Sequence, residues 1–374
     1  MNFEEHVAKA EFAAAGIPVP EGRVVTTPAE AEAAARALGP VAVKAQAPAG
    51  KRGKAGAIAL AESPAEAAAA ARRILGMTLG AHRIKRLLVE KRIAIARELY
   101  AAVLNDPASQ GPLVLFSTLG GMDIEEAAAR DPQSVRRHPV DILAGFAAKD
   151  AETMLGGLDL GPAQALLADL LVRLYAFYRA RDAELVEINP LALTRSGTLV
   201  ALDGKLALDD GALARQESLA KQGLAEPLTG LEARGRAAGL RFIELDGDIG
   251  ILANGAGLTM TTMDAVRHYG GRPANFLEIG GDAYTRAKPA LELVLANPNV
   301  RSLVVNFCGA FARTDVMAEG VVTAWEELRP KIPVFFSIHG TGEEEAVRLV
   351  KGRLGVEPFD SMDDAVEGAV RAAR

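Results

Sequence analysis

The chain has 374 residues, of which 49% are hydrophobic and 24% charged, and its formal net charge is −6. This composition indicates a soluble globular protein with room for two or three domains. It has no basic tract to bind nucleic acid, no apolar run near the roughly 20 residues of a membrane span, and one cysteine, Cys308, which excludes a disulfide framework.

The start of the chain bears on its location. The opening Met-Asn-Phe-Glu-Glu-His lacks the basic and apolar regions of a signal peptide. A single cysteine fits a reducing compartment. We therefore expect a cytoplasmic protein that does not associate with membranes.

The first part of the chain mixes helical and strand patterns. A helix over residues 4–15 ends at Gly16-Ile17-Pro18, and a second helix begins at Thr27-Pro28, a cap followed by proline. Further helices are predicted over 63–75 and 161–179, and strands near Val24 and over 41–44, 57–60, 86–90, 98–104 and 112–116. This mixed order predicts an α+β domain.

From about residue 240 apolar strands alternate regularly with helices. The predicted strands cover residues 249–253, 275–279, 302–307 and 333–338. Alternation of this kind is typical of a doubly wound parallel sheet. We expect two domains, 1–238 and 239–374.

A glycine-rich loop follows each of these four strands. The loops cover residues 254–257, 280–282, 309–313 and 340–342. Loops at the carboxyl ends of parallel strands form the binding crevice, and the helices that follow attract anions. Four such loops on one edge predict an anionic or nucleotide-like ligand.

Residues 184–205 read as a hairpin, since two apolar runs flank Arg195-Ser196-Gly197-Thr198. Folding about Ser196 pairs Asn189 with Asp203 and Glu187 with Lys205, all on one face of the sheet. A carboxylate and an amide oxygen suit Mg²⁺. Pro190 is placed to disturb this register. The alternative is a surface hairpin with an ordinary ion pair.

Residues 46–56 are too rich in Gly, Pro and Lys for a regular element, and within them the loop Gly50–Gly56 has the composition of a phosphate cover. Its glycines admit close backbone approach, and Lys44, Lys51, Arg52 and Lys54 supply charge. It is not a Walker A motif, because Gly-Lys-Ser/Thr is absent. The alternative is a solvated basic loop. No two of the five histidines have metal-ligand spacing.

Five segments together follow the pattern of one enzyme family. They are Met-Asn-Phe-Glu-Glu-His-Val-Ala-Lys at the start, residues 43–46, residues 52–56, the hairpin motifs 186–190 and 202–205, and a long signature from Gly247 through Asn254-Gly255-Ala256-Gly257-Leu258 to Gly270-Gly271. On these segments the chain resembles the β subunit of succinate–CoA ligase (succinyl-CoA synthetase), as a divergent member of that family. The resemblance covers nearly the whole chain.

The resemblance implies an ATP-grasp domain followed by a flavodoxin-like CoA-ligase domain. It also implies an α-subunit partner that binds most of the CoA and carries a histidine that becomes phosphorylated. In the family reaction a small carboxylic acid, CoA and Mg²⁺-bound ATP or GTP give acyl-CoA, nucleoside diphosphate and phosphate. Acyl phosphate and phosphohistidine are the intermediates.

The resemblance also assigns roles position by position. It implies nucleotide contacts for Lys44, Gly53, Glu90, Ile93 and Glu98, in a site to which Lys51 and Arg52 add charge. It implies Mg²⁺ ligation by Asn189 and Asp203, assistance to phosphoryl transfer by Glu187, and contact with the acid by Asn254, Ala310, Phe311 and Ala312.

The sequence departs from the family pattern at four places. Lys51 stands in place of Gly, Leu119 in place of Glu, His339 in place of Glu, and Gly-Ala-Phe-Ala-Arg at 309–313 in place of Gly-Gly-Ile-Val-Arg. Ala310 makes a positive φ costly, and Phe311 brings an aromatic face. We expect a preference for another short acid, such as malate or citrate. The alternative is that Phe311 packs into the core and leaves the pocket unchanged.

Two other functions remain open from sequence. One is an ATP-grasp ligase that joins a carboxylate to an amine without CoA, against which the glycine-loop domain argues. The other is a non-enzymatic binding module. The intact set of Lys44, Glu187, Asn189 and Asp203 argues against that function.

Overall fold

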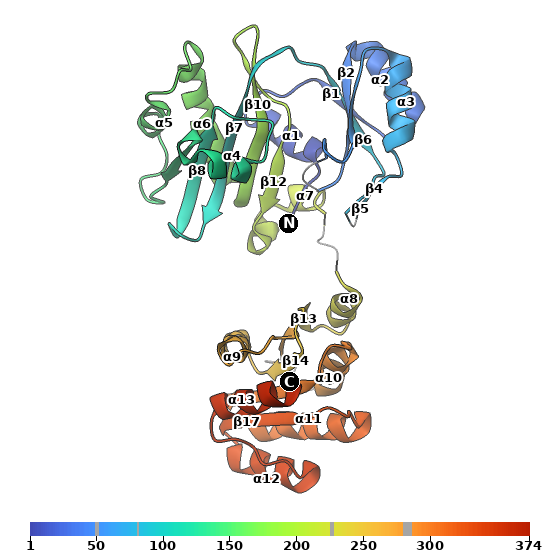
Figure 1. Cartoon of the computed structure of the whole chain (residues 1–374), viewed down its shortest axis with the longest axis vertical. Helices are drawn as coiled ribbons and strands as arrows, with labels where there is room; N and C mark the ends of the chain where they lie inside the picture. The colour runs from blue at the N-terminus through green and yellow to red at the C-terminus, as the bar shows by residue number, and fades with distance from the viewer. Residues whose placement is uncertain (49–51, 81, 225–227, 280–285) are drawn as a thin grey trace. The chain divides into compact units, whose positions relative to one another are not determined.

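The structure is a computed structural model of the whole chain, and it describes residues 1–48, 52–80, 82–224, 228–279 and 286–374. The chain folds into two compact units, Met1–Glu226 and Pro227–Arg374 (Figure 1). The boundary expected between residues 238 and 239 falls inside the second unit, just after helix α8 (Gly230–Ala237).

A four-stranded antiparallel sheet forms one part of the first unit. Its order is β1-β6-β2-β3, with β1 at Gly22–Val25, β2 at Val41–Ala45, β3 at Ile58–Ala61 and β6 at Leu87–Lys91. Helices α2 (Pro28–Leu38) and α3 (Pro64–Ile74) share its hydrophobic core. Helix α2 begins at the predicted Thr27 cap followed by Pro28, and α3 begins in the same way at Ser63 and Pro64; each cap side chain accepts a backbone hydrogen bond.

A six-stranded antiparallel sheet forms the rest of the first unit. Its order is β11-β10-β7-β8-β9, and β12 also pairs with β10. The strands are β7 (Ile95–Asp106), β8 (Gly111–Ser117), β9 (Val135–Pro139), β10 (Ala183–Thr194), β11 (Leu199–Ala201) and β12 (Lys205–Leu208). Helices α1 (Glu5–Ala14), α5 (Ala148–Leu155) and α6 (Ala163–Ala180) pack into the same core.

The hairpin register is the predicted one. Strand β10 pairs with β12 at Glu187 and Lys205, and the turn closes through a hydrogen bond from the Thr194 amide to the Thr198 carbonyl. Pairing of β10 is interrupted on both sides near Pro190, which follows a cis peptide bond. On the hairpin side the partner divides into β11 and β12, which pair with β10 at Leu191 and at Glu187 in one continuous register. The register between β10 and β7 shifts between Ile188 and Leu191 while the hairpin register is kept.

The second unit is built on a five-stranded sheet of order β13-β15-β14-β16-β17. The strands are β13 (Arg241–Glu244), β14 (Ile249–Ala253), β15 (Asn275–Glu278), β16 (Ser302–Gly309) and β17 (Val334–Gly340). All pairings are parallel except that of β13 with β15, so the predicted parallel sheet gains one antiparallel edge strand. The helices are α9 (Ala256–His268), α10 (Ala287–Ala296), α11 (Thr314–Leu328), α12 (Glu343–Leu354) and α13 (Met362–Ala373).

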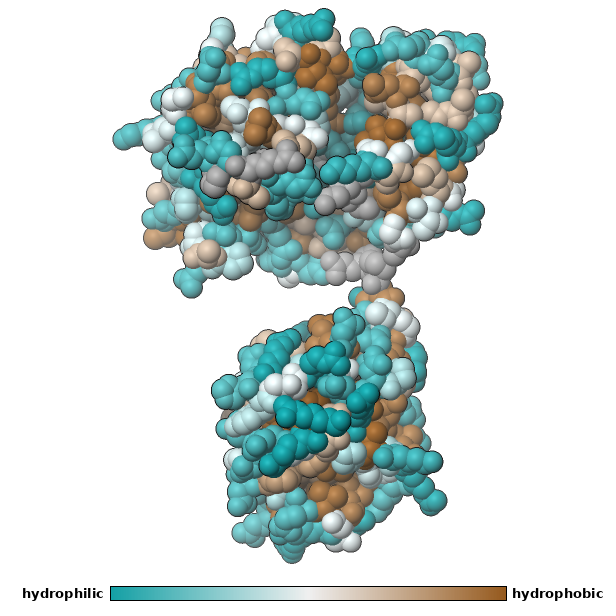
Figure 2. All heavy atoms as spheres, in the orientation of Figure 1, coloured by the Kyte–Doolittle hydropathy of each residue, from teal (hydrophilic) through white to brown (hydrophobic). Residues whose placement is uncertain are grey.

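Short elements complete the described chain. They are β4 (Thr78–Leu79), β5 (His82–Arg83), α4 (Ile124–Arg130), η1 (Pro132–Ser134), η2 (Asp210–Arg215) and α7 (Glu217–Ala220). Hydrophilic residues predominate on the face drawn in Figure 2, with apolar patches between them. None of the helices in the described ranges has the length and apolar character needed to cross a bilayer.

Candidate functional site

Two neighbouring strands bring Lys44 and Glu90 together in the first unit. Lys44 lies on β2 and Glu90 on β6, and the Lys44 Nζ is 2.8 Å from a Glu90 carboxylate oxygen. Both side chains are buried. Burial would lower the pKa of Lys44, but Glu5, Glu90 and Asp203 outweigh it and raise that pKa above its ordinary value. Lys44 is therefore a permanent positive charge in the site.

Arg52 adds a second cation from the glycine-rich loop. Its Nη1 donates to the Ala45 carbonyl (2.9 Å), and its Nη2 donates to the Asp203 carboxylate (2.6 Å). Gly53, the next residue, is exposed. Lys51, also expected to face the nucleotide, lies outside the described residues. The buried Arg52 excludes the alternative of a basic loop that is solvated throughout.

Of the remaining nucleotide candidates, Ile93 lies in the connection from β6 to β7 and Glu98 lies on β7. Ile93 is half-buried and Glu98 is exposed on β7. The Gly120 amide donates to the Glu98 backbone carbonyl (3.0 Å), and a Cβ at Gly121 would lie 2.0 Å from the Glu98 carboxylate. The loop that contains Leu119 therefore packs directly over Glu98, with Leu119 itself 43% exposed.

The candidate metal ligands lie on the two arms of the hairpin, Asn189 on β10 and Asp203 between β11 and β12. The Asn189 Oδ1 accepts from the Gly121 amide (2.8 Å), and Asp203 accepts from the Gly204 amide (2.8 Å) as well as from Arg52. In the described part of the chain no three His, Cys, Asp or Glu side chains are grouped to hold a metal. An amide oxygen and a carboxylate fit Mg²⁺, which keeps waters and phosphate oxygens as its other ligands.

Glu187 lies one pleat away from Asn189 on the same face of β10. Burial raises its pKa; Lys205 opposes that shift, and the carboxylates of Asp203, Glu125 and Asp123 add to it. Burial and the nearby Glu187 likewise raise the pKa of Tyr100. A carboxyl group with a raised pKa is a stronger proton acceptor once ionised, which suits general base work.

The loops at the carboxyl edge of the second sheet are tied together by Asn254. Its side-chain amide donates to the Cys308 carbonyl and its Oδ1 accepts from the Cys308 amide, both at 2.8 Å. Asn254 thus joins the end of β14 to the end of β16. Gly255, with a φ of 107°, is the N-cap of helix α9. The loop of residues 280–282 lies outside the described residues.

Ala310 in the loop of residues 310–312 does not take the positive φ that its side chain makes costly. The non-glycine residues with positive φ in the described ranges are Gln110, Asp182 and Arg329, so the backbone avoids the costly conformation at Ala310. The Ala310 carbonyl accepts from the Thr341 hydroxyl (2.9 Å), which links two of the glycine-rich loops.

Phe311 is fully exposed, at 105% of its reference surface, so the alternative in which it packs into the core is wrong. Ala312, by contrast, is partly buried against the core of the second unit. The loop therefore presents an aromatic side chain at the edge where an acid is expected.

His339 lies in register with Cys308 on the neighbouring strand. Its ring is 41% exposed and its Nδ1 is 3.8 Å from the Glu343 carboxylate, which also accepts from the Gly340 amide (2.8 Å). A distance of 3.8 Å is an ion-pair distance and not a hydrogen bond.

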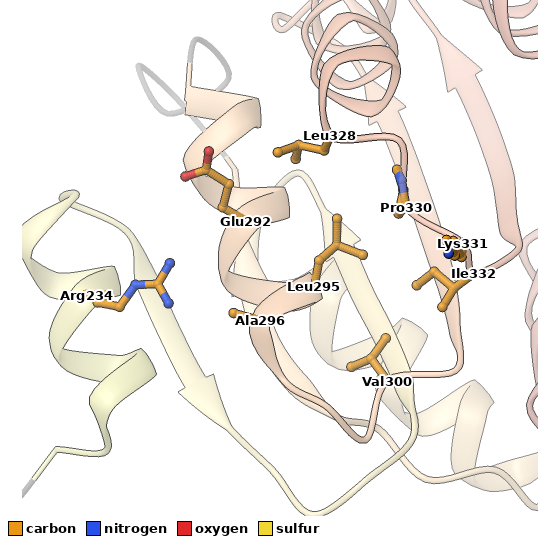
Figure 3. A pocket seen from close by; sticks show the side chains of 9 residues that line it. All are labelled: Arg234, Glu292, Leu295, Ala296, Val300, Leu328, Pro330, Lys331 and Ile332. Atoms are coloured by element: carbon orange, nitrogen blue, oxygen red, sulfur yellow. The ribbon is translucent and has the colours of Figure 1, made fainter.

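A separate cavity of about 420 Å³ lies in the second unit between α8, α10 and the chain that follows α11 (Figure 3). Leu295, Val300, Leu328 and Ile332 form its apolar wall, and Arg234 and Lys331 are at its rim. None of the residues singled out from the sequence lines it. The candidate site is therefore not this hollow.

Sequence reasoning missed two residues that the fold brings into the site, Glu5 and Lys9. Both lie on α1 and are buried against Lys44 and Glu90. Their spacing of four residues marks them as a helical ion pair, but only the fold shows what else they touch.

Family comparisons agree with this architecture. Residues 2–193 match the family model for an ATP-grasp domain, and residues 252–370 match the model for a CoA-ligase. The two matches correspond to the α+β first unit and the parallel-sheet second unit. Their combination defines the class of protein as an NDP-forming acid–thiol ligase.

Curated relatives narrow the class. The chain is 44% identical over its full length to subunit beta of the ADP-forming succinate–CoA ligase of Rubrobacter xylanophilus, 99% of which is covered. It is 42% identical to subunit beta of the GDP-forming succinate–CoA ligase of Thermus thermophilus, with 94% of each chain covered. The chain belongs to the succinate–CoA ligase β-subunit family.

A solved structure shares the fold. ATP citrate lyase from Methanothrix soehngenii, in complex with citrate and coenzyme A, aligns with a TM-score of 0.68 at 24% identity, and 99% of both chains is covered. At this identity the likeness concerns the fold alone.

Proposed function

We propose that this chain is the nucleotide-binding β subunit of a carboxylate–CoA ligase of the succinate–CoA ligase type, acting in the cytoplasm. Its first unit binds Mg²⁺ with ATP or GTP and phosphorylates a histidine of a partner α subunit, which binds most of the CoA. The observation that carries this proposal is the convergence of Lys44 and Arg52 on the hairpin that contains Asn189 and Asp203.

The chemistry asked of these residues is mainly electrostatic. Phosphoryl transfer needs the charge of the phosphates neutralised and the groups held in line. Lys44 and Arg52 supply fixed positive charge, and Asn189 and Asp203 would hold a Mg²⁺ ion that neutralises phosphate oxygens. Glu187, with its raised pKa, accepts a proton or hydrogen bond from the imidazole that takes the phosphoryl group.

The chain by itself should not become phosphorylated. His6 contacts Gln46 and Glu4, and His268 packs edge-on against Tyr269. His339 is only loosely associated with Glu343. Incubating the pure chain with γ-³²P-labelled ATP or GTP and Mg²⁺ is expected to leave it unlabelled. Acid-labile label on one of its own histidines would contradict a division of labour between two subunits.

The acid is proposed to bind at the carboxyl edge of the second sheet. The Asn254 bridge fixes the ends of β14 and β16, and backbone N–H groups at the start of α11 attract a carboxylate. The relatives are named for succinate. The exposed Phe311 favours a different short acid, such as malate or citrate.

The triple variant Ala310→Gly, Phe311→Ile, Ala312→Val tests this preference. We expect the ratio of kcat/KM for succinate to that for the best wild-type acid to rise about 10-fold or more, since pocket changes of this size alter binding by about 1–3 kcal/mol. Ile243→Val, on the edge strand β13 and 50% exposed, is the control and should change nothing. If succinate is the best wild-type substrate and the triple variant keeps the same ratio, Phe311 does not set the acid.

The experiment that tests the whole proposal uses the chain co-expressed with an α subunit of its own genome. Release of nucleoside diphosphate is measured with CoA over a panel of short acids, with each nucleotide in turn. Release that requires CoA and one acid supports the proposal. Release with an amine and no CoA would support the amine-ligase alternative, which the CoA-ligase match disfavours.

A further inference from the structure

A buried cluster of charged side chains joins the N-terminal helix α1 to the nucleotide strands. It contains three cations and three carboxylates, namely Lys9, Lys44, Arg52, Glu5, Glu90 and Asp203. Buried ion pairs add little net stability, because desolvation offsets most of the Coulombic gain. The cluster is therefore better explained by what it holds in place.

Glu5 is at the centre of this ion cluster, with a side chain only 1% exposed. One carboxylate oxygen lies 2.8 Å from the Lys9 Nζ and 2.9 Å from the Lys44 Nζ, and the other lies 2.8 Å from the Arg52 Nη2. Burial would raise the pKa of Glu5, but the three cations outweigh it and hold that pKa well below its ordinary value. An ionised carboxylate thus fixes both cations assigned to the nucleotide phosphates.

The ion cluster also holds the strand that leads to the metal ligand. The Lys9 ammonium donates to the Leu202 carbonyl (2.6 Å), and the Lys44 ammonium donates to the same oxygen. Leu202 directly precedes Asp203. The position of Asp203 relative to Lys44 is therefore set by contacts that α1 makes.

Arg52 is shared between two carboxylates that are not equivalent. Its Nη2 donates to Asp203 at 2.6 Å, on a side chain that is 30% exposed, and also lies 2.8 Å from the buried Glu5 Oε2, which has no other partner among the ion pairs of the described residues. If Asp203 turns to a divalent cation, Arg52 can redirect its hydrogen bond to Glu5 without leaving the site.

We propose that Glu5 is a positioning residue of the nucleotide site: it holds Lys44 and Arg52 for the phosphates and takes over Arg52 when Asp203 ligates Mg²⁺. This inference rests on the proposed function. Its distinctive consequence is that Glu5, which is bound to Lys9, Lys44 and Arg52 and is not one of the assigned metal or nucleotide ligands, controls how much Mg²⁺ is needed for nucleotide binding.

Replacing Glu5 alone by a neutral residue leaves an excess of buried positive charge and endangers the fold. The variant pair is therefore Glu5→Asp, which keeps the charge but shortens its reach, and Glu5→Gln with Lys9→Met, which leaves Lys44 and Arg52 balanced by Glu90 and Asp203. Glu4→Gln is the matched control, because Glu4 adjoins α1, is only 10% exposed and pairs with His6 and Arg86 instead.

The full-length chain is titrated with Mg²⁺–ADP by calorimetry over a range of Mg²⁺ concentrations, and Tm is recorded for each variant. The double variant is expected to keep Tm within a few degrees of wild type, to bind ADP about 10-fold more weakly, and to need about 10-fold more Mg²⁺ for half-maximal binding, each a factor worth about 1.4 kcal/mol. Glu5→Asp should shift both quantities in the same direction by a smaller factor, and Glu4→Gln neither.

The results of these titrations can contradict the role of Glu5 without contradicting nucleotide binding by the chain. Wild-type affinity and Mg²⁺ dependence in both Glu5 variants would overturn the positioning role alone. Weakened binding that merely follows a lowered Tm, with unchanged Mg²⁺ dependence, would also overturn it, since that is a purely structural effect. A wild-type chain that binds no Mg²⁺–nucleotide would overturn the proposed function and the inference with it.

Discussion

Asp203→Asn is expected to lower the rate of phosphoryl transfer to the partner subunit by on the order of 10³-fold. A metal ion supplies several kcal/mol of charge stabilisation in such a transition state, and each 1.36 kcal/mol is about tenfold in rate. The amide replaces a charged oxygen ligand but can still accept the hydrogen bond from the Gly204 amide, so the turn is kept. The rate is measured by quenched flow with γ-³²P-labelled nucleotide, from limiting to saturating Mg²⁺.

Asp209→Asn is the control for this substitution. Asp209 follows β12 and caps the short helix η2 through the Gly211 amide, a role that Asn also fills. It should transfer phosphate at the wild-type rate. An Asp203→Asn variant that does the same at limiting Mg²⁺ would show that Asp203 does not hold the metal.

Glu187→Gln is expected to slow phosphoryl transfer by about 10² to 10⁴-fold, the usual range for loss of a general base. It should also remove the acidic limb of the pH–rate profile. Burial raises the pKa of Glu187, so the active ionised form is lost as pH falls through a value above the 4.5 of an ordinary Glu. The measurement is kcat/KM for phosphoryl transfer against pH.

Glu187→Gln is expected to lower the rate of phosphoryl transfer but not the thermal stability of the chain. A carboxyl group with a raised native pKa contributes stability that is present below its unfolded pKa and is lost as pH rises through the native one. At neutral pH Glu187→Gln should therefore match or exceed the wild-type Tm. Glu184→Gln, at an exposed residue of the same strand, is the control. If the acidic limb of the pH–rate profile is still present in Glu187→Gln, a group other than Glu187 causes it.

Sequence patterns predicted those parts of the fold that are determined by residues close together in the chain. Thr27-Pro28 and the Ser196-Gly197 turn fix a helix start and a hairpin register from neighbouring residues alone. Strands β9 and β13 were missed, because both are edge strands whose charged side chains break the apolar alternation. The Val-Arg-Arg-His-Pro of β9 pairs only because β8 offers it a partner.

The same holds for the candidate site: contacts between residues close in sequence were predictable, and contacts between distant residues were not. Glu187 and Lys205 pair across a short turn, so the hairpin half of the site followed from spacing. The contact of Lys9 with the Leu202 carbonyl joins residues 193 positions apart, and no local pattern reports it. Phe311 was open to two interpretations because an aromatic residue in a loop is as compatible with a core as with a surface. Only the three-dimensional environment excluded the first.

We propose that this chain passes the γ-phosphoryl group of a nucleotide to a histidine of a second subunit. The most direct test incubates the co-expressed α/β pair with Mg²⁺ and γ-³²P-labelled ATP or GTP, without acid or CoA, and separates the subunits. We predict acid-labile, base-stable label on the α subunit alone, discharged when the preferred acid and CoA are added together. Absence of label from the α subunit in a pair that still forms acyl-CoA would contradict this account.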